Sequence, residues 1–204
     1  MNEFSSLWED RVGRVIEPEK DWLQVSLKEG ANIQSKGPYR VSRRDQECID
    51  ETFDTMQKDG RMSASEGVNP VGWPVFVVWA NEKGRPVVDL RGLNANVVQD
   101  AYPLPLQQEI FNLLRGMWLI SIFDVQKAFY QHFVAYKDQW KFTVVTHRGQ
   151  EIFNIAAMGY CGSPSHMQRF MDKILDPHKA FACCYINDVM IFSRTFEEHL
   201  IYLC

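Results

Sequence analysis

Two apolar runs near the end of the chain are separated by only two residues, and this spacing limits the fold more than any other feature. Residues 181–186 and 189–192 are typical of buried strands, and Asn187-Asp188 between them is typical of a two-residue turn. Strands joined by so short a turn pair antiparallel. The sequence therefore predicts a β-hairpin with an acidic residue at its tip.

A second acidic residue ends another apolar run. Residues 118–123 predict a strand, and Asp124 follows where a side chain reaches the rim of a sheet. We expect Asp124 and Asp188 to converge on one sheet edge, where their hard carboxylate oxygens suit Mg²⁺. Nucleotidyl transfer uses two divalent cations about 4 Å apart. A simpler interpretation of Asn187-Asp188 is ordinary turn chemistry, which needs no metal.

The rest of the chain predicts short strands and helices. These elements are a helix from Ser42 to Gly60, strands at 75–79 and 86–90, a helix from Pro105 to Leu114, strands at 141–146 and 151–155, a helix from Ser163 to Asp176, and a last helix from Thr195. The helix that begins at Pro105 carries an apolar stripe that must face a core. This order predicts an α+β fold with an antiparallel sheet backed by helices.

Composition narrows the class of protein. Hydrophobic residues make up 46% of the 204 residues, enough for a core without disulfides or metals. Neither a membrane-length apolar run nor a signal peptide is evident, so we expect an intracellular protein, cytoplasmic or nuclear and not secreted, with no membrane partner. The net charge of -4 means that nucleic-acid binding needs a local basic surface. The five cysteines lack metal-ligand spacing and are expected to be buried thiols.

Several segments together resemble the polymerase region of gypsy-type LTR retrotransposons, especially the fungal ones. The match is collinear from about Gly37 to Leu203. Its motifs are residues 72–78 (GWPVFVV), 88–94 (VDLRGLN), 100–105 (DAYPLP), 123–131 (FDVQKAFYQ), 158–164 (MGYCGSP) with Gln168, and 185–193 (YINDVMIFS). The resemblance implies the fingers and palm of a right-hand polymerase, a reverse transcriptase that adds deoxynucleotides to a primer 3′ hydroxyl.

By this resemblance the catalytic residues are Asp124, Asp188 and Asn187. Asp124 and Asp188 would hold Mg²⁺, with two ions expected and Mn²⁺ as a substitute. Asn187 stands where the family normally has a further metal-binding Asp. A unit charge at 4 Å is worth about 4 kcal/mol at an effective dielectric of 20. At about 1.4 kcal/mol per decade, replacing the charge with an amide would weaken metal binding roughly a thousandfold.

The resemblance also implies a set of residues that bind the deoxynucleoside triphosphate. Phe129 occupies the position of the aromatic that blocks a ribose 2′ hydroxyl, with Ala128 beside it, and Met158 belongs to the nucleotide pocket. Lys83 and Arg85, near the tip of the 75–90 hairpin, resemble the family's triphosphate clamps. Plain core packing is the alternative for Phe129.

Nucleic-acid contacts are implied at Asp89, Arg91 and Gln168. Asp89 and Arg91 match the family motif where the template passes the fingers, although a solvated ion pair explains them as well. Gln168 resembles a template-positioning residue in the helix under the active site. Solvation on a helix surface is the alternative for an isolated Gln.

The resemblance divides the chain into segments of known type. They are an N-terminal extension at 1–38, fingers at 39–99 and 132–157, and palm at 100–131 and 158–204. A thumb would be absent and the palm cut short. The apolar side of the last helix, at Phe196, Leu200 and Leu203, would then lack partners, and self-association through this palm edge is expected.

The sequence is compatible with two functions. The first is a reverse transcriptase impaired by Asn187 and by truncation, with an RNA or DNA template, a primer and deoxynucleoside triphosphates as partners. The alternative is a catalytically inactive, transposon-derived remnant that binds nucleic acid or takes part in assembly. A sheet that stacks RNA bases is a third reading, but the chain lacks the aromatic pattern of such platforms.

Overall fold

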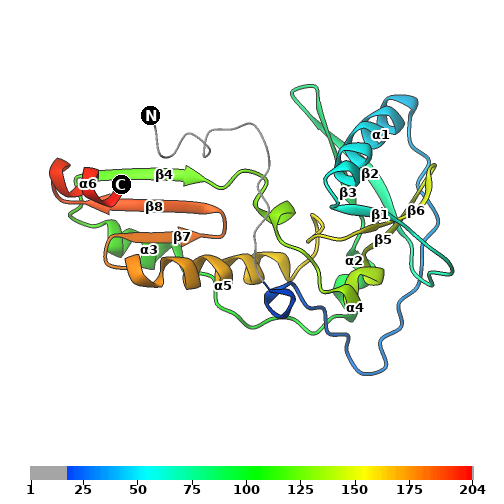
Figure 1. The fold of residues 1–204 in the computed structure, drawn as a ribbon, viewed down its shortest axis with the longest axis horizontal. Helices are drawn as coiled ribbons and strands as arrows, with labels where there is room; N and C mark the ends of the chain where they lie inside the picture. The colour runs from blue at the N-terminus through cyan, green and yellow to red at the C-terminus, as the bar shows by residue number, and fades with distance from the viewer. Residues whose placement is uncertain (1–17, 204) are drawn as a thin grey trace.

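Two β-sheets occupy opposite ends of an elongated molecule in the computed structural model, which describes residues 18–203 (Figure 1). The larger sheet has five strands in the order β1-β6-β5-β2-β3, and the smaller has three in the order β4-β8-β7. Among the strands of these two sheets, β2 and β5 pair in parallel and the other pairs are antiparallel. The predicted α+β class with mainly antiparallel sheets is confirmed.

The five-stranded sheet is assembled from two separate parts of the chain. Its strands are β1 (Met62–Ala64), β2 (Trp73–Ala80), β3 (Lys83–Val88), β5 (Thr143–Thr146) and β6 (Gly149–Phe153). The two parts meet where Trp73 and Pro74 of β2 pair with Val144 and Val145 of β5. The hydrogen bonds of this sheet therefore join segments about 70 residues apart in sequence.

Helix α1 (Arg43–Lys58) covers this sheet and begins where the sequence predicts. The Ser42 hydroxyl accepts a hydrogen bond from the Asp45 amide at 3.2 Å, and the Asp45 carboxylate accepts one from the Ser42 amide at 3.1 Å. This capping box satisfies two amides that the first helical turn leaves without partners. Ile49, Phe53 and Met56 form the buried face, and the Phe53 ring meets Phe153 edge to face.

The β2–β3 hairpin turns more tightly than the predicted strands at 75–79 and 86–90 imply. Only Asn81 and Glu82 form the turn, and both have positive φ, as a two-residue turn between twisted strands requires. Lys83 and Gly84 already pair with β2. The absence of a side chain at Gly84 allows the ring of Trp79 to approach, and the Trp79 indole donates to Asp45 of α1 at 2.8 Å. The hairpin is thereby fixed to the helix.

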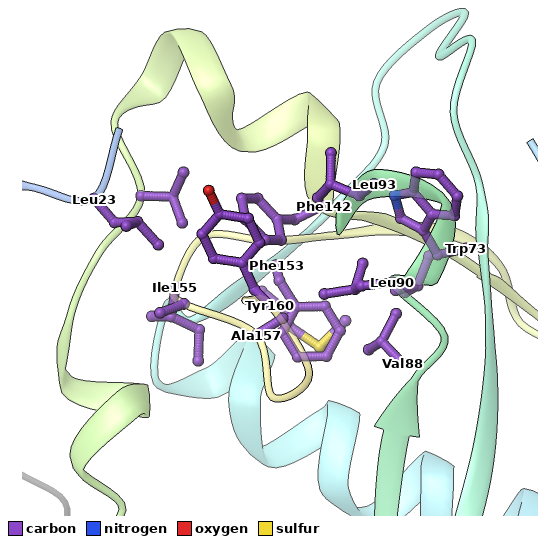
Figure 2. Packing of buried hydrophobic residues seen from close by; sticks show 14 of the residues in the cluster. Leu23, Trp73, Val88, Leu90, Leu93, Phe142, Phe153, Ile155, Ala157 and Tyr160 are labelled. Carbon is purple, nitrogen blue, oxygen red and sulfur yellow. The ribbon is translucent and has the colours of Figure 1, made fainter. Parts of the chain in front are cut away.

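The main core lies between α1, the larger sheet and the segment 155–160 that follows β6 (Figure 2). Trp73 is fully buried in this core, and its indole donates to the carbonyl of Lys141 at 2.7 Å. The ring of Phe142 meets Tyr160 edge to face with centroids 5.2 Å apart. Rings this large stabilise a core strongly, because each removes a large apolar area from water.

Part of the predicted N-terminal extension belongs to this core. Leu23 and Val25 are buried, and the Val25 amide donates to Asp138 at 2.9 Å while its carbonyl accepts from Lys141 at 2.6 Å. Asp138 and Lys141 are themselves a buried ion pair whose remaining polar atoms are satisfied by this backbone. Residues 1–17 of the predicted extension lie outside the described residues.

The smaller sheet consists of β4 (Leu119–Asp124), β7 (Ala182–Tyr185) and β8 (Asp188–Ser193). Helix α5 (Ser163–Leu175) runs along one face of it, where Met167 and Met171 pack against Cys184. Helix α6 (Phe196–Leu203) is capped by Thr195 and Glu198 as predicted. Its buried His199 lies between the hydroxyls of Ser121 and Ser193, at 2.8 and 2.9 Å.

Helix α3 (Gln107–Leu114) contradicts one prediction. The helix begins two residues after Pro105, and none of its residues is buried; Leu106 just before it is 65% exposed and Phe111 is 63% exposed. The expectation that its apolar stripe faces a core is wrong. Helical spacing predicts an amphipathic helix, but it carries no information about which element covers the apolar side.

Short helices and single turns complete the chain. They are η2 (Glu19–Asp21), α2 (Arg91–Asn96), η3 (Ala128–Gln131), α4 (Tyr136–Gln139), η4 (Trp140–Phe142) and η5 (Asp176–His178). Within residues 18–203, no helix combines the length and apolar character that crossing a bilayer requires. The intracellular location stays a prediction. Cys161 is exposed, so the expectation of buried thiols is wrong for that residue, and Cys204 is outside the described part.

A close approach at Gly92 provides a test of the core. A Cβ there would lie 2.6 Å from Cζ3 and 2.9 Å from Cη2 of Trp73, a fully buried ring with no room to move. We expect Gly92→Ala to lower the free energy of unfolding by about 1–3 kcal/mol in chemical denaturation. Gly37→Ala is the matched control, because a Cβ at Gly37 meets nothing within 4 Å. Equal losses in both variants would contradict this account.

Candidate active site

Two carboxylates meet at one end of the smaller sheet. Asp124 is the last residue of β4, Asp188 is the first residue of β8, and the antiparallel register pairs them directly. Directly paired residues project from the same face of a sheet with Cβ atoms about 4.5–5.5 Å apart. The predicted convergence of the two acids is confirmed by this register. Both side chains are exposed.

The hairpin between β7 and β8 turns one residue earlier than the sequence predicts. Ile186 and Asn187 form the turn, while Asp188 is already in the strand and pairs with Tyr185. Ile186 has φ +58°, a left-handed conformation that is unfavourable for a β-branched side chain. The prediction of Asn187-Asp188 as the turn is therefore wrong, and turn chemistry does not explain Asp188.

Asn187 lies against Asp124. Its side-chain amide donates to Asp124 Oδ1 at 2.6 Å, and its backbone carbonyl accepts from the Val125 amide at 3.0 Å. A carboxylate only accepts hydrogen bonds, so the amide nitrogen must face it. The nitrogen thus lies beside an oxygen that a cation would otherwise approach.

The residues present fit a divalent cation that takes few protein ligands. Within residues 18–203, no group of three or more His, Cys, Asp or Glu side chains is arranged to hold a metal ion by itself. Mg²⁺ is ordinarily held by one or two carboxylates and completes its octahedron with water and substrate phosphates. The pair Asp124 and Asp188 matches that requirement, provided that the Asn187 amide turns its nitrogen away from Asp124.

A cavity of about 670 Å³ opens beside Asp124 and Asn187. It lies between helix α1, strand β3 and residues 124–130, and it is lined by Arg85, Ala128, Phe129 and Met158 among others. Four of the five residues predicted to bind a nucleotide are thus brought together. Lys83 does not line this cavity, and Asp188 lies beside it only through its strand pairing with Asp124.

Phe129 fits both of its interpretations. It packs against the cluster formed by Ala128, Met167, Met171 and Cys184, and it also lines the cavity. The packing contacts position Phe129 where it borders the open volume. Core packing and a role toward a bound ligand are therefore compatible here.

Sequence reasoning missed the contribution of helix α1 to the cavity. Thr52 and Thr55 of the helix and Asp59 at its C-cap line the cavity together with Arg85. Their spacing is a helical signal that could have been noticed. Lys127 also lines the cavity, with φ +49°, and no sequence pattern indicates that conformation at a lysine.

Asp89 is an internal anchor for Arg91. The Asp89 side chain is 2% exposed, and the Arg91 guanidinium, in a side chain 80% exposed, donates two hydrogen bonds of 2.8 Å to it. Tyr39 donates a third at 2.6 Å, and Lys36 lies 3.4 Å away. The Arg91 guanidinium is the main cause that holds the pKa of Asp89 well below its usual range.

This arrangement corrects two readings of the pair. A freely solvated ion pair is wrong, because the Asp89 carboxylate is buried. For the same reason Asp89 has no surface to offer a template strand, and its effect on one would act through the orientation of Arg91. A template contact by Arg91 stays a prediction.

Gln168 is fully buried in α5, so solvation on a helix surface is wrong for it. Its side-chain oxygen accepts from the Ile186 amide at 2.7 Å, and its nitrogen donates to Asp172 at 2.8 Å. A buried side chain does not itself contact a template. The predicted role toward nucleic acid would have to act through the hairpin that Gln168 supports.

Comparison with known families gives a match over residues 79–203 to the family described as reverse transcriptase (RNA-dependent DNA polymerase). The enzymatic polyprotein of cauliflower mosaic virus (strain Strasbourg) is 28% identical in an alignment of 192 residues that covers 90% of this chain and 28% of that polyprotein. The transposon Tf2-3 polyprotein of Schizosaccharomyces pombe is 30% identical over 145 residues, 70% of this chain and 11% of that polyprotein. The chain spans less than a third of these relatives.

Solved structures agree on the fold. The foamy viral protease-reverse transcriptase dRH in complex with ds DNA superposes with a TM-score of 0.77 at 20% identity, over 96% of this chain and 34% of that one. A prototype foamy virus protease-reverse transcriptase mutant gives 0.81 at 18% identity, over 96% of this chain and 26% of that one. At such identities the likeness concerns the fold alone.

The buried Asp89 predicts a pH-dependent stability. Because its folded pKa is depressed, its contribution is fully present above the unfolded pKa of about 3.9 and is lost as the pH falls toward the folded pKa. We expect Asp89→Asn to have a lower free energy of unfolding than the parent at pH 7. This difference in free energy should narrow below about pH 4. Urea denaturation at several pH values measures it.

The control is Asp176→Asn, an exposed carboxylate beside Lys179 on the surface. We expect little difference from the parent at any pH, because exposed pairs contribute little. A gap between Asp89→Asn and the parent that stays constant from pH 7 to pH 3 would contradict the assignment.

Proposed function

The chain belongs to the reverse transcriptase (RNA-dependent DNA polymerase) family, and from that premise we propose that it forms the fingers and palm of an enzyme that adds deoxynucleotides to a primer on a nucleic-acid template. The observation that carries the proposal is the cross-strand pair of Asp124 and Asp188 beside a cavity lined by Arg85 and Phe129. A gypsy-type element, related to fungal ones, is the proposed source, supported by the motifs from 72–78 to 185–193.

The proposed division of the chain follows the two sheets. Fingers at 39–99 and 132–157 correspond to the five-stranded sheet with α1, and palm at 100–131 and 158–204 corresponds to the three-stranded sheet with α5. Residues 1–38 are the proposed N-terminal segment, of which Leu23 and Val25 pack into the core of the proposed fingers. The cavity lies between the two parts, because α1 and β3 come from one and residues 124–130 from the other.

Asp124 and Asp188 would hold the divalent cations, Mg²⁺ or Mn²⁺. When bound, these ions activate the 3′ hydroxyl and neutralise charge on the triphosphate. Asn187 opposes this role, because its amide supplies no negative charge and its nitrogen donates a hydrogen bond to an Asp124 oxygen that a cation would need. The proposed enzyme is therefore impaired in metal binding relative to one with an Asp at this position.

The cavity residues have separate proposed roles toward the deoxynucleoside triphosphate. Arg85 is positioned to meet phosphate charge with a planar fork of donors, and Phe129 would lie under the sugar, where an aromatic ring leaves no space for a 2′ hydroxyl. Ala128 and Met158 would complete the pocket wall. Lys83 is a weaker candidate, because it lies outside the cavity.

Template and primer are the proposed macromolecular partners. The foamy viral relative was solved with double-stranded DNA, which supports a duplex as ligand of the shared fold. Arg91 is the proposed template contact. Contact with a second copy over the exposed apolar side chains of α6, Phe196, Leu200 and Leu203, is a further prediction.

The alternative is an inactive remnant that binds nucleic acid without extending it. The hydrogen bond from Asn187 to Asp124 favours it, because that bond satisfies the carboxylate in the absence of a cation. Extension and binding assays on the same protein separate the two functions.

Primer extension on an RNA template tests the first function. We expect Asn187→Asp to tighten metal binding by up to roughly a thousandfold and to raise the extension rate, because a second negative charge then faces the cation. The rate is measured with Mg²⁺ and with Mn²⁺. Asp124→Asn in the Asn187→Asp background is the matched control and should abolish extension. Extension that survives Asp124→Asn would contradict the assigned site.

Filter binding of single-stranded and duplex nucleic acid at two salt concentrations tests the alternative. Phosphate contacts predict a steep loss of affinity with salt. We expect Arg91→Ala to weaken binding and to reduce the slope of log affinity against log salt by about 0.7–0.9. Arg43→Ala, which removes an exposed arginine on α1, is the control. Absent or salt-independent binding would eliminate this function.

A further inference from the structure

The turn that carries Asn187 is in a conformation that its own residues do not favour. Ile186 has φ +58°, and for L-residues other than glycine the left-handed region costs roughly 1–2 kcal/mol. Such a conformation persists only when surrounding contacts impose it. The contact that meets Ile186 comes from helix α5, 18 residues away in sequence.

Gln168 makes that contact with both ends of its side-chain amide. Its oxygen accepts from the Ile186 amide at 2.7 Å, and its nitrogen donates to the Cys184 carbonyl at 3.2 Å. The side chain is fully buried, so water does not compete for these bonds. Gln168 thus hydrogen-bonds to the hairpin backbone on both sides of Tyr185.

Asp172 determines which way the Gln168 amide faces. One turn further along α5, its carboxylate accepts from Gln168 Nε2 at 2.8 Å, and it also accepts from the Tyr102 hydroxyl at 2.6 Å. An ionised carboxylate only accepts hydrogen bonds, so the nitrogen of Gln168 must point to it and the oxygen to Ile186. The bond to Asp172 is the main cause that raises the pKa of Tyr102 to about 12.

We propose that Gln168 is a positioning residue for the acidic centre: its amide, oriented by Asp172, holds Ile186 in the left-handed conformation and thereby sets Asn187 and Asp188 against Asp124. The bond from the Val125 amide to the Asn187 carbonyl depends on the same turn. This role concerns the geometry of the hairpin and does not require that the chain be catalytically active.

Amide hydrogen exchange by NMR tests the proposal in the parent protein and in Gln168→Met, which keeps the length of the side chain and removes its hydrogen bonds. We expect exchange of the Ile186 and Val125 amides to accelerate on the order of tenfold or more, the loss of about 1.4 kcal/mol of local stability. The Phe192 amide of β8, which donates to the Phe181 carbonyl just before β7 and far from the turn, should change little. Equal acceleration at all three amides would overturn the proposal, because it indicates general destabilisation.

Ile186→Gly in the Gln168→Met background separates positioning from mere packing. Glycine adopts positive φ without steric cost, so the turn keeps its shape without the amide. We expect protection of the Val125 amide to return, while the amide of residue 186, still lacking its acceptor, exchanges fast. If protection of Val125 does not return, the loss comes from the altered core and the proposal is wrong.

Two further variants complete the design. Asp172→Asn removes the carboxylate that orients Gln168 and should accelerate the same two amides even if Gln168→Met does not fold. Gln139→Met removes another glutamine-to-backbone bond, to Val134 in the other part of the molecule, and should leave both amides unchanged. An unaffected Ile186 amide in Asp172→Asn would contradict the orienting role.

A parallel Mn²⁺ titration keeps this result distinct from the proposed function. Failure of the parent and of Asn187→Asp to bind Mn²⁺ would contradict the proposed metal site, whereas the exchange rates decide the role of Gln168 by themselves.

Discussion

The pairing of β4 with β8 is the interaction on which the rest of the site depends. Its register sets Asp124 opposite Asp188, and a slip of one residue would move every side chain of β4 to the other face of the sheet. His199 of α6 contacts both strands through Ser121 and Ser193, one from each. The two acids therefore meet because the pairing of β4 with β8, and the contacts of α6 with both strands, are compatible with one strand register.

The acidic centre combines this favourable register with an unfavourable turn. Ile186 in the left-handed region is a local conflict between residue type and conformation, of the kind that occurs where function or tertiary contacts override local preference. The buried amide of Gln168 resolves the conflict from α5. At the same centre Asn187 supplies a hydrogen bond where a charge would suit a cation, so the geometry of the site is retained while its electrostatics are altered.

Carboxylates elsewhere act by orienting a partner. The buried Asp89 holds the exposed guanidinium of Arg91, and the half-buried Asp172 holds the amide of Gln168 in the same way. In both cases an acceptor-only group removes the freedom of a donor to rotate. The cavity also depends on tertiary structure, because Arg85 lies on β3 and Phe129 on η3, and only the packing of these two elements brings both side chains to one volume.

The sequence by itself determined the elements and the identity of the acids. Local signals sufficed for the capping box at Ser42, the strand that ends on Asp124 and the α+β class, because each depends on residues close together in the chain. Only the tertiary structure decided that the apolar side of α3 stays exposed, that the hairpin turns at Ile186, and that Asp89 and Gln168 are internal. Those outcomes depend on contacts between segments tens of residues apart, which local preferences do not encode.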